Sequence, residues 1–185
     1  IAETINENEK VRKEIRNVFR HNAVITSKVV KTKAEDEGAQ KYSDYFDFSE
    51  PLKRCSSHRL LAMRRGEKEG FLRISISADD DECKNRIRRI YVQGRGDCSH
   101  LVGEAADDAF KRLLKPSIET EYALSSKQAA DNEAIKVFAE NLRQLLLAAP
   151  LGQKRVMGVD PGFRTGCKVV CLNAQGTLLH FEAIY

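Results

Sequence analysis

The sequence lacks any apolar run close to the ~20 residues that a membrane-spanning helix requires. It begins Ile1-Ala2-Glu3-Thr4, without an initiator Met and without a charged segment followed by an apolar leader. We therefore expect no membrane partner and no secretion signal, and we expect the chain to be an internal piece of a longer protein.

A large excess of charge is also missing, because 31 Lys and Arg residues face 27 Asp and Glu residues and leave a net charge of +4. A net positive charge as small as this permits binding to nucleic acid but does not require it. The cysteines are scattered, and their odd number, five, leaves one thiol outside any internal set of disulfides. This usage fits a reducing cytoplasm, which is the location that we expect.

What the chain does contain is the composition of a folded protein, with 42% hydrophobic residues over 185 positions. This length allows one complete core and part of another. Helical periodicity ends near Pro150, and short β-rich runs follow, so we place a domain boundary at residues 151–155. The expected domains are a helical one over 1–150 and the truncated start of another over 151–185.

Apolar residues at helical spacing predict an amphipathic helix over 8–20, begun by a capping box of Asn6 and Glu9. The short apolar stretch 24–30 could be helix or strand, and we favour helix. Three aromatic residues within 42–48 share one helical face, and Pro51 is placed as a helix-start residue would be.

A further helix is expected from Ser56 or Ser57 to about Gly66, followed over 71–77 by the only clear strand before residue 150. Acidic residues 79–82 precede another helix, which Gly94 ends. The remaining expected helices carry Leu101 to Leu113 and Ile135 to Ala149, with Pro116 between them and a capping box of Ser125 and Gln128 opening the second.

Beyond the boundary, the predicted strands cover 156–159, 168–172 and 177–185, and a tight turn over 173–176 joins the last two. The expected fold class is mainly α: a multi-helix domain with one isolated strand, followed by a partial three-stranded antiparallel sheet. Such a sheet, without covering helices, leaves an open edge and an apolar face. We therefore expect residues 156–185 to self-associate or to be poorly ordered.

One segment, Gly158 to Gly166, has the form of a functional site, because Asp160 stands at a strand end before a glycine-bearing turn. A nuclease could use this aspartate to hold divalent cations, and an actin-like ATPase could use the turn as a phosphate loop. In the third interpretation Asp160 only orders the Pro-Gly turn, which is the commoner role of these residue types. A two-metal site needs several carboxylates. The sequence does not show whether Glu182 lies on the same face of the sheet as Asp160, so no second carboxylate is assigned to the site. We therefore expect no metal and no cofactor.

Basic side chains before the boundary could follow a phosphate backbone, although a solvated surface is the favoured interpretation because acidic residues are interspersed. The candidates for nucleic-acid contacts are Lys53, Arg54, Arg64, Arg65, Arg86 and Arg89.

Four motifs together resemble the bacterial Tex family of transcription accessory proteins. They are Asp44-Tyr-Phe-Asp-Phe-Ser-Glu-Pro-Leu-Lys53, Ser57-His-Arg59, Leu145-Leu-Leu-Ala-Ala-Pro150 and Gly158-Val-Asp-Pro-Gly162. The resemblance implies a helical portion leading into a ribonuclease-H-like (YqgF or resolvase-type) α/β domain that begins near Arg155 and has no nuclease activity. In that family, helix-hairpin-helix and OB-fold RNA-binding modules come later in the chain.

The family is similar to a eukaryotic elongation factor that contacts histones and RNA polymerase. The resemblance therefore implies nucleic acid, RNA or DNA, as a partner of the whole protein, and RNA polymerase or other transcription machinery as a further one. We expect a non-catalytic scaffold that orients nucleic-acid-binding modules. The alternative is a metal-dependent nuclease or an ATPase centred on Asp160.

Overall fold

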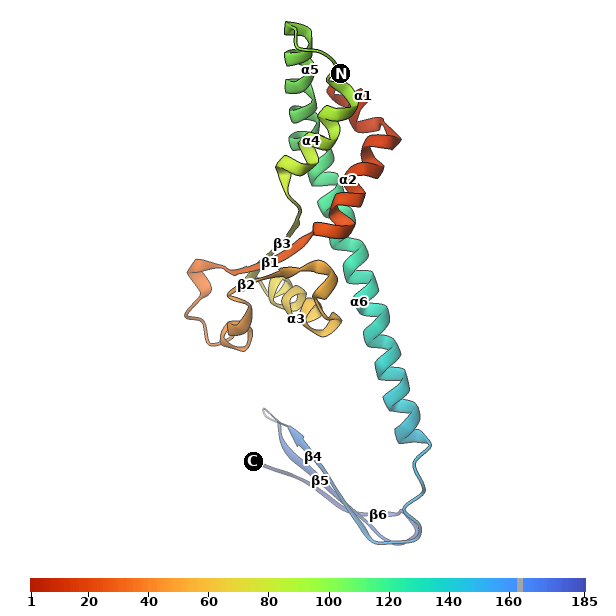
Figure 1. The fold of residues 1–185 in the computed structure, drawn as a ribbon. Helices are drawn as coiled ribbons and strands as arrows, with labels where there is room; N and C mark the ends of the chain where they lie inside the picture. The colour runs from red at the N-terminus through yellow and green to blue at the C-terminus, as the bar shows by residue number, and fades with distance from the viewer. Residues whose placement is uncertain (163–164) are drawn as a thin grey trace. The chain divides into compact units, whose positions relative to one another are not determined.

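The computed structural model describes residues 1–162 and 165–185, which form two compact units, Ile1–Ala139 and Glu140–Tyr185 (Figure 1). Phe163 and Arg164, two residues of the candidate segment Gly158 to Gly166, lie outside the described residues. The division falls inside a helix and not at residues 151–155, where periodicity places the domain boundary, and that boundary stays a prediction. No helix in this described part is both long enough and apolar enough to cross a membrane.

Helices dominate the first unit. The α-helices of the chain are α1 (Ala2–Glu7), α2 (Glu9–Asn22), α3 (Ser57–Lys68), α4 (Asp80–Tyr91), α5 (Asp97–Asp108) and α6 (Lys115–Leu146). Helix α2 is the predicted amphipathic helix, but its cap is Asn8, whose side chain accepts hydrogen bonds from the amides of Lys10 and Val11 at 2.9 and 3.3 Å. The predicted capping box of Asn6 and Glu9 is therefore wrong by two residues.

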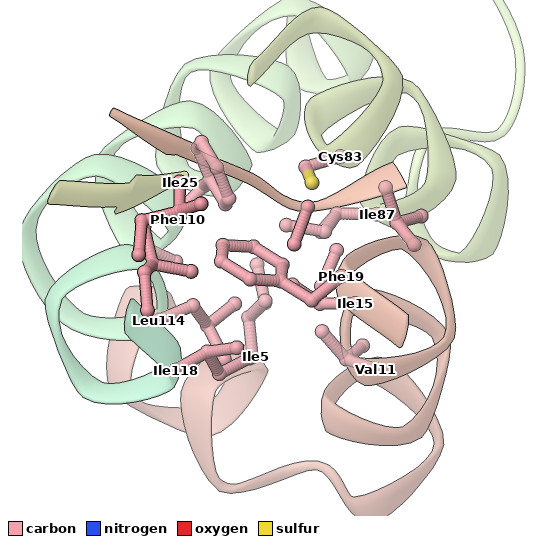
Figure 2. Close-up of a cluster of buried hydrophobic side chains, with 14 of the residues drawn as sticks. Ile5, Val11, Ile15, Phe19, Ile25, Cys83, Ile87, Phe110, Leu114 and Ile118 are labelled. Carbon is pink, nitrogen blue, oxygen red and sulfur yellow. The ribbon is translucent and has the colours of Figure 1, made fainter. Parts of the chain in front are cut away.

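The core of this unit gathers around Phe19 of α2, which is 2% exposed. Figure 2 shows its ring among apolar side chains from helices that are far apart in the sequence. Around it lie Ile5, Ile15, Ile87, Phe110, Leu114 and Ile118. The ring of Tyr122 on α6 lies 5.3 Å from that of Phe19, so residues more than 100 positions apart form one apolar cluster.

A three-stranded antiparallel sheet interrupts the helices, in the order β2-β1-β3. Its strands are β1 (Val24–Val29), β2 (Asp47–Pro51) and β3 (Leu72–Ser77). The predicted strand over 71–77 is therefore not isolated, and the helix favoured over 24–30 is wrong. Ile25 and Ser27 of β1 are both fully buried, and because a serine occupies a core position, the two-residue period of a strand is hidden in the sequence.

The segment before β2 is also different from the predicted helix over 42–48. A 3₁₀ helix, η2 (Gln40–Tyr45), buries Tyr42 and ends where the strand begins. Pro51 closes β2 instead of starting an α-helix, and proline suits this place because β2 is an edge strand. Two further 3₁₀ turns, η1 (Lys31–Lys33) and η3 (Leu52–Arg54), follow strands β1 and β2.

Helix α3 runs through Gly66 to Lys68, past its predicted end. A Cβ added at Gly66 would lie 2.6 Å from Cδ1 of Leu72, so this glycine allows α3 to approach β3 closely. The chain turns instead at Gly70, whose φ is 78°. Helix α4 ends at Tyr91, ahead of the predicted stop at Gly94.

Pro116 stands near the start of α6 and has no amide hydrogen to donate. A π-helical turn, η4 (Ala109–Leu114), precedes it, and the amide of Lys115 bonds to the carbonyl of Phe110, five residues back. Helices α5 and α6 are thus joined through a wider turn. The predicted capping box at Ser125 is wrong, because Ser125 lies inside α6 and donates its hydroxyl to the carbonyl of Tyr122 at 3.3 Å.

The second unit contains the three predicted strands, which form an antiparallel sheet in the order β4-β5-β6. They are β4 (Val156–Gly162), β5 (Gly166–Leu172) and β6 (Leu178–Ile184). The predicted turn is present, with the Asn173 carboxamide oxygen accepting from the amides of Gln175 and Thr177 at 3.0 and 2.8 Å. All of β6 is exposed and β6 is an edge strand, but self-association through residues 156–185 stays a prediction.

Candidate functional site

Asp160 lies in strand β4 and is exposed. The register of the sheet places Lys168 of β5 directly opposite Asp160, and Ala183 of β6 directly opposite Lys168. Residues that are opposite each other in a sheet project to the same face, so one carboxylate, one ammonium and one methyl group form a row. The row offers a single acidic ligand.

Glu182 is the other acidic side chain of this sheet, and the structure settles which way it faces. It pairs with Val169, which pairs with Val159. Because neighbouring residues of a strand project to opposite faces, Glu182 lies on the other side of the sheet from Asp160. The two carboxylates therefore cannot hold the same ion.

Toward Val156, the face around Asp160 is apolar or bare. The next row along the strands consists of Gly158, Val170 and Phe181. A Cβ at Gly158 would lie 3.0 Å from Cγ2 of Val170, so the valine fills the space that the glycine leaves. On the other side of Asp160, the Thr165 hydroxyl lies next to Gly162, where an added Cβ would be 2.5 Å from its oxygen. Among the described residues, no group of three His, Cys, Asp or Glu side chains could hold a metal ion.

The turn interpretation of Asp160 depends on hydrogen bonds to backbone amides two residues onward. Within residues 1–162 and 165–185 no hydrogen bond is made by the Asp160 carboxylate, and Pro161 and Gly162 continue strand β4. The carboxylate is thus presented to solvent from a strand.

Two of the six basic candidates are already paired with acidic side chains. Arg86 lies 3.3 Å from carboxylate oxygens of both Glu14 and Glu82. Arg64 pairs with Glu67 at 2.8 Å, and its side chain is only 18% exposed. Arg86 thus joins α4 to α2, while Arg64 pairs within α3 and donates to the Ala123 carbonyl of α6 at 3.4 Å, so both offer little to a phosphate.

The other four candidates are exposed, and no ion pair engages them among the residues that the structure describes: Lys53, Arg54, Arg65 and Arg89. Arg89 lines an open cavity of about 420 Å³ together with Asp79, Asp81 and Glu82, whose charges oppose the binding of an anion. These four candidates are distributed over three elements, η3, α3 and α4.

Comparison with protein families accounts for most of the chain. Residues 1–138 match the model described as Tex central region-like, and residues 154–185 match the Tex protein YqgF-like domain. The chain belongs to the Tex family.

Individual relatives agree with this assignment. The chain is 35% identical over its whole length to the Bordetella pertussis protein named Protein tex, of which it covers 25%. It is 36% identical over 92% of its length to the Transcriptional accessory protein Tex of Neisseria gonorrhoeae, covering 23% of that protein. Human S1 RNA-binding domain-containing protein 1 is 29% identical over 86% of the chain, which covers 17% of it. The chain thus spans about a quarter of the length of the bacterial relatives.

Two of the motifs that resemble Tex, 44–53 and 57–59, meet in a polar cluster that sequence reasoning missed. Arg59, at the start of α3, lies 3.2 Å from Glu50 of β2, and its Nε donates to the Ser56 hydroxyl at 3.0 Å. Burial, with a smaller contribution from Glu50, raises the pKa of the Cys55 thiol to about 12, so this thiol is no nucleophile at neutral pH. In the Tex chain the ion pair between Arg59 and Glu50 connects helix α3 to strand β2. The feature of the sequence that could have predicted this contact is the pair of opposite charges, Glu50 and Arg59, nine residues apart on either side of Ser56.

Proposed function

We propose that this Tex family member contributes a non-catalytic part of a transcription accessory protein, one that orients nucleic-acid-binding modules without cutting nucleic acid. The observation that carries the proposal is the isolation of Asp160, since Glu182 lies on the opposite face and Lys168 stands opposite the carboxylate. A divalent cation prefers about six oxygen ligands, of which one aspartate supplies at most two.

The names of the relatives support a role beside nucleic acid. One relative is named a transcriptional accessory protein, and another is named for an S1 RNA-binding domain. The four exposed candidate cations, Lys53, Arg54, Arg65 and Arg89, can add electrostatic contacts to phosphates from three separate elements. We therefore assign the chain's main contribution to the fixed geometry of its helical unit, and we expect transcription machinery to be a partner of the whole protein.

A salt titration with single-stranded RNA tests this role. Fluorescence anisotropy is measured between about 50 and 200 mM salt for the wild-type chain and for a variant with Lys53, Arg54, Arg65 and Arg89 changed to Ala. We expect weak binding by the wild type, with a Kd of about 10 to 100 μM at 150 mM salt, as in non-specific complexes. The slope of log K against log salt is negative, and each phosphate contact contributes about 0.7 to its magnitude on single strands. If all four cations contact phosphates, the slope of the variant is therefore shallower by about 3.

The matched control removes Arg86 and Arg64, which are paired with carboxylates, and is expected to change the slope by less than about 1. A wild-type Kd below about 1 μM that the four substitutions leave unchanged would contradict the scaffold role, because it would require a dedicated binding site elsewhere in the chain.

A further inference from the structure

We propose that Lys168 keeps divalent cations away from Asp160, so that this end of β4 does not bind Mg²⁺ or Mn²⁺. The inference rests on the proposed non-catalytic function and assigns a cause to it. The family's ribonuclease-H-like fold implies a metal beside the strand-end aspartate, and the residues present do not fit one.

The position of Lys168 follows from strand register. Directly opposite residues of an antiparallel pair have Cβ atoms about 4.5 to 5.5 Å apart, so Asp160 and Lys168 share the same small region of the sheet face. The described residues include no direct ion pair between them, and both side chains are exposed. The four-carbon stem of the lysine is flexible and long enough to bring its ammonium to the carboxylate.

The positive charge of Lys168 acts in two ways. It neutralises the attraction that a single carboxylate has for a cation, and it repels the cation itself. A divalent and a monovalent charge about 5 Å apart repel each other, even at the dielectric constant of water, by enough to weaken binding at least about tenfold.

Among the residues that the structure describes, no second acidic side chain on this face offsets this repulsion, and the neutral Thr165 hydroxyl beside Gly162 carries no charge. The other members of the row and of the next row are Ala183, Gly158, Val170 and Phe181, and none of them has an oxygen ligand. Even a cation that reached Asp160 would keep most of its water ligands. Lys168 is thus the residue that decides between a very weak cation site and none.

The test follows binding of Mn²⁺ to the full chain by the paramagnetic broadening of backbone amide NMR signals near Asp160. The variants are Lys168→Gln, which removes the charge, and Lys168→Glu, which adds a second carboxylate in the same row. Lys154→Glu is the matched control, because it makes the same change of charge in the same unit, six residues before Asp160. Adding Asp160→Asn to Lys168→Glu shows whether any new binding needs the aspartate.

We expect the wild type to show no broadening centred on Asp160 at up to about 1 mM Mn²⁺, the weak end of carboxylate sites. Lys168→Gln should require about tenfold less Mn²⁺ than the wild type for equal broadening, and Lys168→Glu less still. The Lys154→Glu control should behave as the wild type, and Asp160→Asn should abolish the gain.

Two results would overturn the proposal. One is wild-type broadening at Asp160 that saturates below 1 mM Mn²⁺; the other is a response of both Lys168 variants that is no greater than that of Lys154→Glu. If Lys168→Glu loses the strand signals of β4 and β5, the Lys168→Gln comparison decides alone. RNA binding and Mn²⁺ binding are separate measurements, so the scaffold role and this inference can fail independently.

Discussion

Phe19→Ala is expected to lower the free energy of unfolding of the helical unit by about 4 kcal/mol, within the range of about 3 to 5 found for large aromatic residues in cores. Phe19 is 2% exposed, and its ring contacts side chains from several helices together with the ring of Tyr122 (Figure 2). The substitution leaves a cavity that these rigid neighbours cannot close. Because single domains are stable by only about 5 to 15 kcal/mol, this loss removes roughly a quarter to four fifths of the stability.

Urea denaturation followed by circular dichroism measures this effect, with Phe138→Ala as the control. Phe138 lies in the same compact unit but is 67% exposed, so the same change should alter stability by no more than about 0.5 kcal/mol. Equal losses in the two variants would mean that Phe19 does not occupy the core described here.

Gly66→Ala is expected to destabilise the same unit by about 1 to 3 kcal/mol, although alanine favours helices more than glycine does. The added Cβ would lie 2.6 Å from Cδ1 and 2.9 Å from Cγ of Leu72, and 3.2 Å from Cγ of Tyr42. Leu72 and Tyr42 are almost completely buried, with exposures of 2% and 4%, so neither side chain can move away freely.

The control is Gly103→Ala in helix α5, where the nearest atom to the added Cβ is Cγ2 of Val92, at 3.9 Å. There the helix preference acts without a clash, and a gain of about 0.5 to 1 kcal/mol is expected. Thermal or urea unfolding of the two variants should give shifts of opposite sign. Two stabilising shifts would show that α3 does not pack closely against β3.

Local periodicity was enough to predict the parts of the fold in which each element carries its own pattern. Helix α2 buries Val11, Ile15 and Phe19, which stand at helical spacing in the sequence. Strands β4, β5 and β6 cover the three predicted β-rich runs, although β4 continues three residues past its predicted end. These signals depend only on residues within one or two turns.

The first sheet could not be predicted in this way, because its strands come from distant segments and one core position is held by Ser27. In helix α6 the sequence periodicity predicts the helix but not the exposure of its apolar side chains. Its apolar residues Ile135, Phe138 and Leu142 have helical spacing, yet they are 65%, 67% and 41% exposed. Spacing indicates a helix, but tertiary contacts decide whether its apolar face is covered.

For the candidate site, the sequence predicted Asp160 at the end of a strand over 156–159, whereas β4 continues through Gly162, and the sequence could not give the neighbours of Asp160. The pairing of Asp160 with Lys168, and the opposite facing of Glu182, depend on the register across two connections. A shift of one residue would reverse each facing, so only the structure could decide them. Likewise, sequence could not tell that Arg64 and Arg86 are engaged by carboxylates.

The most direct test of the account is a cleavage assay with the purified chain, comparing wild type and Asp160→Asn on RNA and on a four-way DNA junction in Mg²⁺ or Mn²⁺. A lone carboxylate beside an ammonium should activate no water, so we predict that neither protein cuts either substrate above the background without protein. Metal-dependent cleavage by the wild type that Asp160→Asn abolishes would contradict the account.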